Sequence, residues 1–88
     1  MKRYSYYALF YKVPHGWDFY FKEVGGIGAC DSKEDALSTA RESLKISLED
    51  MIEAGKEIPE PSPREVLEKE ADDPDISEWF VEQVEVDL

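Results

Sequence analysis

The chain has 88 residues, 42% of them hydrophobic and 35% charged, and this size and composition indicate a single folded domain. Its formal net charge of −11 argues against direct nucleic-acid binding, because proteins bind nucleic acid largely through Lys and Arg side chains that neutralise phosphates. Since there is no apolar run long enough for a membrane span, no secretory signal and only one cysteine, Cys30, we expect a cytoplasmic protein that does not bind membranes.

Aromatic residues crowd the first part of the chain, where nine of the eleven lie between Tyr4 and Phe21. Residues 4–13 are apolar at both alternating sets of positions, which predicts a strand covered by a helix on one face and by something else on the other. Residues 14–16, Pro-His-Gly, predict a hairpin loop. Residues 17–23 then alternate more strictly and predict an antiparallel partner strand. Its two faces carry Trp17, Phe19 and Phe21, and Asp18, Tyr20 and Lys22.

The middle of the chain predicts a turn followed by a long helix. Residues 25–30 contain three glycines and predict a tight turn with a brief third strand; their spacing matches neither common phosphate-binding pattern. Asp31 or Ser32 is a candidate helix N-cap, and Gly55 is a candidate C-terminal stop. A helix between these two ends has about 22 residues and is roughly 33 Å long, so it can cross the whole sheet and bury one face of it. Its predicted apolar stripe consists of Leu37, Ala40, Leu44, Leu48, Met51 and Ile52.

The last third of the chain completes the predicted fold. Three prolines at alternate positions in residues 57–63 predict an extended connector. Residues 62–65, Ser-Pro-Arg-Glu, match a capping box and predict a short second helix to about Ala71. Residues 79–88 predict a closing strand, with Phe80, Val84, Val86 and Leu88 on one face. The predicted class is α+β: a three-stranded antiparallel meander, a long helix packed on one sheet face, a short second helix and a closing fourth strand.

Candidate catalytic groups are sparse. The first strand carries no Asp or Glu, and Asp18 and Glu23 fall on opposite faces of the second, so no carboxylates gather as a metal-dependent hydrolase requires. His15, the single histidine, lies in a predicted loop without a nearby nucleophile. The aspartates of residues 73–77 lack the glycine and the distal glutamate of a calcium-binding loop. We expect no enzymatic activity, no metal site and no cofactor.

The aromatic segment therefore suggests a surface for binding. Residues 1–30 carry four basic and two acidic residues, whereas residues 31–88 carry six basic and nineteen acidic ones. A base-stacking platform needs a positively charged groove, which the acidic remainder of the chain opposes. We expect one face of the segment to be core and the other to contact a protein. The candidate partner-binding residues are Tyr7, Tyr11, Asp18, Tyr20 and Lys22.

Five segments occur in a recognisable order: residues 7–11, 17–21, 32–36, 55–62 and 84–88. The most specific is Gly-Lys-Glu-Ile-Pro-Glu-Pro-Ser at residues 55–62. In order and spacing these segments resemble the HicB-like antitoxin family of type II toxin–antitoxin systems, in its short form, over essentially the whole chain. The sequence departs from the family at Val-Gly-Gly-Ile, ahead of Cys30, where the family usually has Leu-Pro-Gly-Cys, so a contact of the family at that turn is not carried over.

The resemblance implies a partial ribonuclease H-like fold without catalytic carboxylates, and a function. The family binds and blocks a small basic toxin that is similar to a double-stranded-RNA-binding domain and cleaves mRNA. Many members carry a DNA-binding domain as well; here we expect a single domain, residues 1–88, without one. The alternative is a stand-alone homo-oligomeric structural or ligand-binding domain without a toxin. In both cases we expect a dimer or tetramer, because the second apolar face of the first strand needs a cover, most simply another copy.

Overall fold

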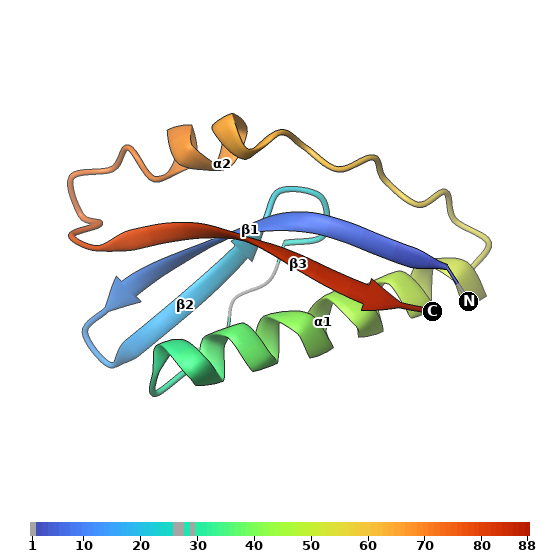
Figure 1. The fold of residues 1–88 in the computed structure, drawn as a ribbon, viewed down its shortest axis with the longest axis horizontal. Coiled ribbons are helices and arrows are strands. Elements are labelled where there is room, and N and C mark those ends of the chain that lie inside the picture. Colours follow the sequence, from blue (N-terminus) through green and yellow to red (C-terminus); the bar gives the residue numbers. More distant parts are fainter. Residues whose placement is uncertain (1, 26–27, 29) are drawn as a thin grey trace.

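The computed structural model describes residues 2–25, 28 and 30–88. In chain order these residues form β1 (Arg3–Val13), β2 (Gly16–Phe21), α1 (Lys33–Glu53), α2 (Arg64–Glu70) and β3 (Trp79–Asp87) (Figure 1). The strands make one antiparallel sheet in the order β2-β1-β3, with α1 on one face and α2 on the other. The α+β class and the predicted hairpin, helices and closing strand are confirmed. Among the described residues, neither helix has the length and apolar character needed to span a membrane.

The predicted third strand is represented only by its two ends. Residues 26, 27 and 29 of this segment lie outside the described residues. Gly25 forms an isolated bridge with Phe21, and Cys30 forms another with Trp17, each with backbone hydrogen bonds in both directions. The described sheet therefore has three strands where the sequence predicted four. The outer edge of β2 is hydrogen-bonded near both of its ends by this segment.

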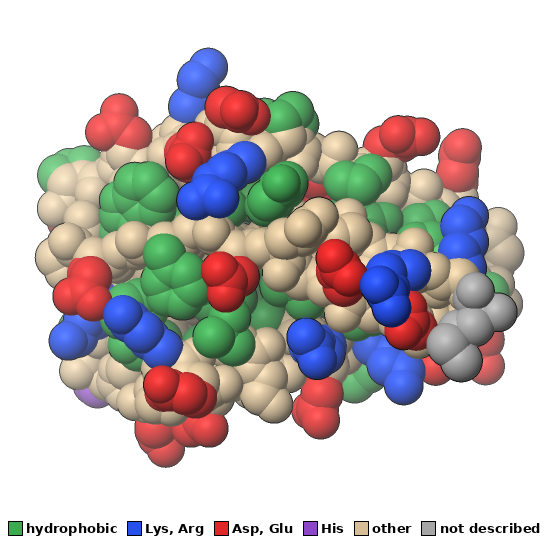
Figure 2. All heavy atoms as spheres, viewed as in Figure 1, with side chains coloured by type: hydrophobic (Ala, Val, Ile, Leu, Met, Phe, Trp, Pro, Cys, Tyr) green, Lys and Arg blue, Asp and Glu red, His purple; other side chains and the backbone are tan. Residues whose placement is uncertain are grey.

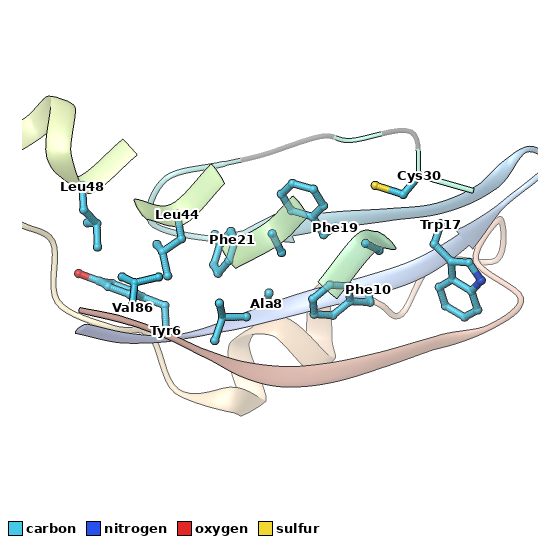
Figure 3. Close-up of a cluster of buried hydrophobic side chains, with 13 residues drawn as sticks. Tyr6, Ala8, Phe10, Trp17, Phe19, Phe21, Cys30, Leu44, Leu48 and Val86 are labelled. Atoms are coloured by element: carbon cyan, nitrogen blue, oxygen red, sulfur yellow. The ribbon is translucent and has the colours of Figure 1, made fainter. Parts of the chain in front are cut away.

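The main core lies between α1 and the sheet (Figure 3). Tyr6, Ala8 and Phe10 of β1 are buried there, together with the predicted apolar face of β2, which carries Trp17, Phe19 and Phe21. Phe10 is fully buried and stacks on Phe80, with 4.9 Å between the ring centroids. The helix begins after Ser32, whose hydroxyl accepts a hydrogen bond from the N–H of Asp35, and Gly55 follows it with φ +70°. The buried positions of α1 are Ala36, Ala40, Leu44 and Leu48.

The predicted apolar stripe of α1 is wrong at its last position. Ile52 is 50% exposed, whereas Leu37 and Met51 are partly buried against the core. Ile52 lies in the final turn beside Leu88, at the end of β3, where the sheet no longer extends beneath the helix. Periodicity alone does not reveal where the sheet ends.

A smaller core lies on the opposite face, where α2 packs. Leu67 and Ala71 cover Leu9 and Val81, so a helix of the same chain supplies part of the cover that the sequence assigned to another copy. The predicted capping box is wrong: the N-cap of α2 is Pro63 and has no side-chain hydrogen bond. The reason is that the chain stays extended up to Pro63, so the helix starts later than a cap at the preceding serine requires.

The connector between the helices is tied to the sheet at two points. The hydroxyl of Tyr6 donates a hydrogen bond of 2.6 Å to the carbonyl oxygen of Pro59, and the N–H of Ser62 donates to the carboxylate of Glu23. Ile58 packs against the main core. These contacts hold the Ile-Pro-Glu-Pro-Ser segment against the sheet, and they thereby determine the position at which α2 packs on it.

Replacing Gly16 with alanine is expected to destabilise the protein by about 3 kcal/mol or more, since backbone strain alone costs about 1–3 kcal/mol. Gly16 has φ +146°, and a Cβ there would overlap the carbonyl oxygen of Cys30. The matched control is Gly55→Ala, with φ +70° and open space around the added carbon, for which we expect only about 1–2 kcal/mol. Urea unfolding measures both free energies. Equal losses in the two variants would contradict the packing role of Gly16.

Candidate partner-binding surface

All five predicted partner-binding residues belong to the sheet face that carries α2. Tyr7 and Tyr11 come from β1 and Tyr20 from β2, and all three pack against the smaller core while remaining partly exposed. Asp18 and Tyr20 are two positions apart on β2 and therefore share a face, and Lys22 directly follows that strand. The five predicted residues thus lie on one face of the sheet, but their surroundings differ.

Lys22 and Tyr7 lie next to α2 and help to hold it. The Lys22 ammonium and the Glu70 carboxylate form an ion pair at 3.0 Å, and this hydrogen bond raises the pKa of Lys22 above its ordinary value. Tyr7 packs against the cluster that contains Leu67. These two residues connect the sheet to α2, and Lys22 is also exposed, so their role in partner binding stays a prediction.

Tyr11 lies at the centre of a row that crosses the sheet. In the register of the strands it pairs with Asp18 of β2 and with Trp79 of β3. We call Asp18, Tyr11 and Trp79 the cross-sheet row. Trp79 is 41% exposed, and the other two are half-buried. The neighbouring row contains Leu9 and Val81 and is already covered by α2, so the cross-sheet row is the next one out, toward the hairpin loop.

Trp79 was missed by reasoning from the sequence. The sequence prediction for the closing strand concerns the face that packs against α1. Trp79 belongs to the opposite face of the same strand. The signal that would have found it is the pairing of β3 with β1, because this register places Trp79 directly beside Tyr11. Strand order, and with it this neighbour, is not encoded in local periodicity.

A hollow of about 530 Å³ opens beside Tyr11. Its apolar lining includes Tyr11 and Tyr20, and the chain after α2 turns past it at the hairpin end of the sheet (Figure 1). Three carboxylates, those of Glu70, Asp73 and Asp75, also line it, together with one ammonium group, that of Lys12. A second hollow is lined by Trp79 together with Glu65, Glu68, Lys69, Ala71 and Asp72. Both hollows combine an aromatic side chain with an acidic rim.

The charges around the cross-sheet row favour a positively charged binding partner. One carboxylate oxygen of Asp18 is buried and has no hydrogen-bond partner among the described residues. Burial, and to a smaller extent the nearby Asp18 carboxylate, raise the pKa of Tyr11 above its ordinary value, so its hydroxyl stays protonated. The half-buried Asp18 therefore contributes a negative charge next to a neutral phenol.

The described residues contain no group of three or more His, Cys, Asp or Glu side chains arranged to hold a metal ion. Fold and surface together define a small acidic α+β domain with an aromatic, acid-rimmed face. Residues 15–88 match the family model described as HicB-like antitoxin of bacterial toxin–antitoxin systems, and the chain belongs to this family. The predicted resemblance is confirmed, although the matched range leaves out the first of the five segments, residues 7–11.

Two solved structures are similar to the chain. A chain of a toxin–antitoxin complex from Streptococcus pneumoniae superposes with a TM-score of 0.77 at 24% identity, over 98% of this chain and 70% of that one, and this likeness concerns the fold. A chain of the HicA3 and HicB3 toxin–antitoxin complex superposes with a TM-score of 0.66 at 25% identity, over 97% of this chain and 100% of that one. No curated protein matches the sequence. The ribonuclease H-like relationship stays a prediction.

Proposed function

We propose that this protein is an antitoxin that binds and neutralises a small, basic, mRNA-cleaving toxin, and that it acts by contact rather than by catalysis. The observation that carries the proposal is the cross-sheet row with its acid-rimmed hollows. The net charge of −11 adds long-range attraction for a basic protein. Membership of an antitoxin family, and similarity to chains from two toxin–antitoxin complexes, support it further.

The chemistry of the row suits arginine and lysine side chains. The guanidinium of arginine stacks on the faces of Trp and Tyr rings and donates to carboxylates at the same time. Trp79 offers an exposed ring, and Asp18 adds a negative charge on β2, the strand on the other side of Tyr11. Tyr and Trp are also the residues that most often carry the binding energy of protein interfaces. Tyr11, Asp18, Tyr20 and Trp79 are therefore the proposed contact residues.

A search of the neighbouring reading frames for a small basic protein, followed by its co-expression with this chain, tests the function. We expect a stable complex on a sizing column, and we expect the purified antitoxin to stop RNA cleavage by that toxin at a stoichiometric ratio. The antitoxin alone, with magnesium or manganese, should leave RNA intact. The absence of a complex would overturn the proposal, and metal-dependent cleavage by the antitoxin alone would favour a residual nuclease.

Association with the toxin is expected to slow by about ten-fold or more as the salt concentration rises from 50 to about 500 mM, since electrostatic steering is screened. The cause is the attraction between a basic toxin and an antitoxin of charge −11. Stopped-flow fluorescence, with Trp79 as an exposed reporter, measures the rate. An association rate that does not change with salt would show that charge does not guide the encounter.

The stand-alone homo-oligomer remains the alternative function. Its original basis was the uncovered apolar face of β1, and α2 now covers part of that face through Leu67. Surfaces that stay open to self-association include the cross-sheet row and, in the described part of the chain, the outer edge of β3.

A further inference from the structure

The two outer edges of the sheet differ. Near both of its ends the edge of β2 is hydrogen-bonded by residues that follow the strand, namely Gly25 and Cys30. In the described part of the chain no strand or bridge pairs with the outer edge of β3. Figure 1 shows this edge turned toward the viewer, with α2 above it and α1 below. An unpaired edge strand is a ready template for another strand.

The hydrogen bonds of β3 show which backbone groups point outward. Leu88 and Lys2 exchange both of their backbone hydrogen bonds, and antiparallel strands repeat such exchanges at every second pair. The even-numbered residues of β3 therefore bond to β1. The N–H and C=O groups that point away from the sheet belong to Trp79, Val81, Gln83, Glu85 and Asp87.

The sequence of β3 is compatible with pairing to itself. An antiparallel pair centred on Gln83 overlaps the whole strand and uses only its outward-pointing groups. This register sets Glu82 opposite Val84, Glu85 opposite Val81, and Asp87 opposite Trp79, so no carboxylate directly faces another. On the α1 side it sets Phe80 opposite Val86. A register shifted to centre on Glu82 or Glu85 would place two glutamates face to face.

Two exposed isoleucines lie near this edge. Ile46, 58% exposed, and Ile52, 50% exposed, border a hollow of about 710 Å³ together with Leu88. The rest of its lining is charged and consists of Lys45, Glu49, Asp50, Glu53 and Asp87. Figure 2, which looks onto the β3 edge, shows hydrophobic side chains interspersed with charged ones. Ile46 and Ile52 account for two of the three exposed large hydrophobic side chains of the described residues. Their position places apolar surface beside the unpaired strand edge, where a further strand would also cover it.

We propose that a second copy of this chain pairs its β3 with β3 across a twofold axis at Gln83, joining the two sheets into one and covering Ile46 and Ile52. Arg3 forms ion pairs with Glu85 and Asp87 at 3.5 and 3.0 Å, and its positive charge offsets half of their combined negative charge at the contact. Both copies nevertheless carry −11, so higher salt strengthens this dimer. Toxin binding has the opposite salt dependence, and the two interactions are thereby distinguished.

The test is sedimentation equilibrium of the full chain at tens of micromolar, at low and at high salt. We expect a dimer that tightens with salt. Gln83→Pro removes an outward N–H from each copy without removing a bond to β1, and Gln83→Lys places two ammonium groups opposite each other. Each is expected to weaken the dimer by at least about ten-fold. Thr39→Lys, the same charge change on the exposed side of α1, is the matched control and should leave the dimer intact.

Amide hydrogen exchange reports the same contact directly. The amides of Val81, Gln83 and Glu85 should exchange fast in the dilute monomer and slowly in the concentrated dimer. A folded wild-type monomer at these concentrations would overturn the proposal. So would a dimer that survives both substitutions, or one that Thr39→Lys also abolishes. Gln83→Lys should still neutralise the toxin, so the failure of one proposal leaves the other standing.

Discussion

Replacing Phe10 with alanine is expected to lower the free energy of unfolding by about 3–5 kcal/mol, the usual loss for removing a buried aromatic side chain. Phe10 is fully buried and joins all three strands: it stacks on Phe80 of β3 and packs against Phe19 of β2 at 6.4 Å between ring centroids. Its removal leaves a cavity where the sheet meets α1. Small domains have a total stability of about 5–15 kcal/mol, so this variant should be close to unfolding.

Urea unfolding followed by tryptophan fluorescence measures the effect, because Trp17 is buried in the same core. Phe10→Leu, which keeps most of the volume, should lose clearly less. Ile46→Ala removes a side chain that is 58% exposed in a single copy and should change monomer stability by less than about 0.5 kcal/mol. If Phe10→Ala lost less than about 1 kcal/mol, the centre of the core would lie elsewhere.

The elements with strong periodicity were predictable from the sequence. The alternation of Trp17, Phe19 and Phe21 gave β2 its buried face, and the two-sided apolar pattern of β1 required two covers, which α1 and α2 supply. The spacing of apolar residues at three and four positions gave α1, with Ser32 and Gly55 at its ends. In each of these cases the spacing of apolar residues within one short segment is enough to predict which face is buried.

Features that depend on contacts between distant segments were not predictable in this way. The predicted brief third strand, residues 25–30, lies partly outside the described residues, and its described ends, Gly25 and Cys30, form isolated bridges with β2. Strand order was open, so the neighbourhood of Tyr11 and Trp79 could not be read from local pattern. The ion pair of Lys22 with Glu70 joins residues 48 positions apart and connects the end of β2 to α2, a contact that no local pattern reveals.

Replacing Trp79 with alanine is expected to weaken toxin binding by about ten- to a hundred-fold, which corresponds to about 1.4–2.7 kcal/mol. Trp79 is 41% exposed and ends the cross-sheet row, so its loss removes a stacking face for basic side chains while leaving the core intact. Asp18→Asn should add a smaller loss, because it keeps the shape of the side chain and removes only its charge.

Calorimetric titration with the toxin measures these affinities, with circular dichroism as the test of folding. Trp79→Phe, which keeps an aromatic face, should recover most of the binding. Ile46→Ala is the matched control, since it truncates an exposed apolar side chain on the β3 and α1 side and should leave toxin affinity unchanged. If Ile46→Ala weakened the complex and Trp79→Ala did not, the toxin would bind at the β3 edge, and the aromatic, acid-rimmed face would be free for another role.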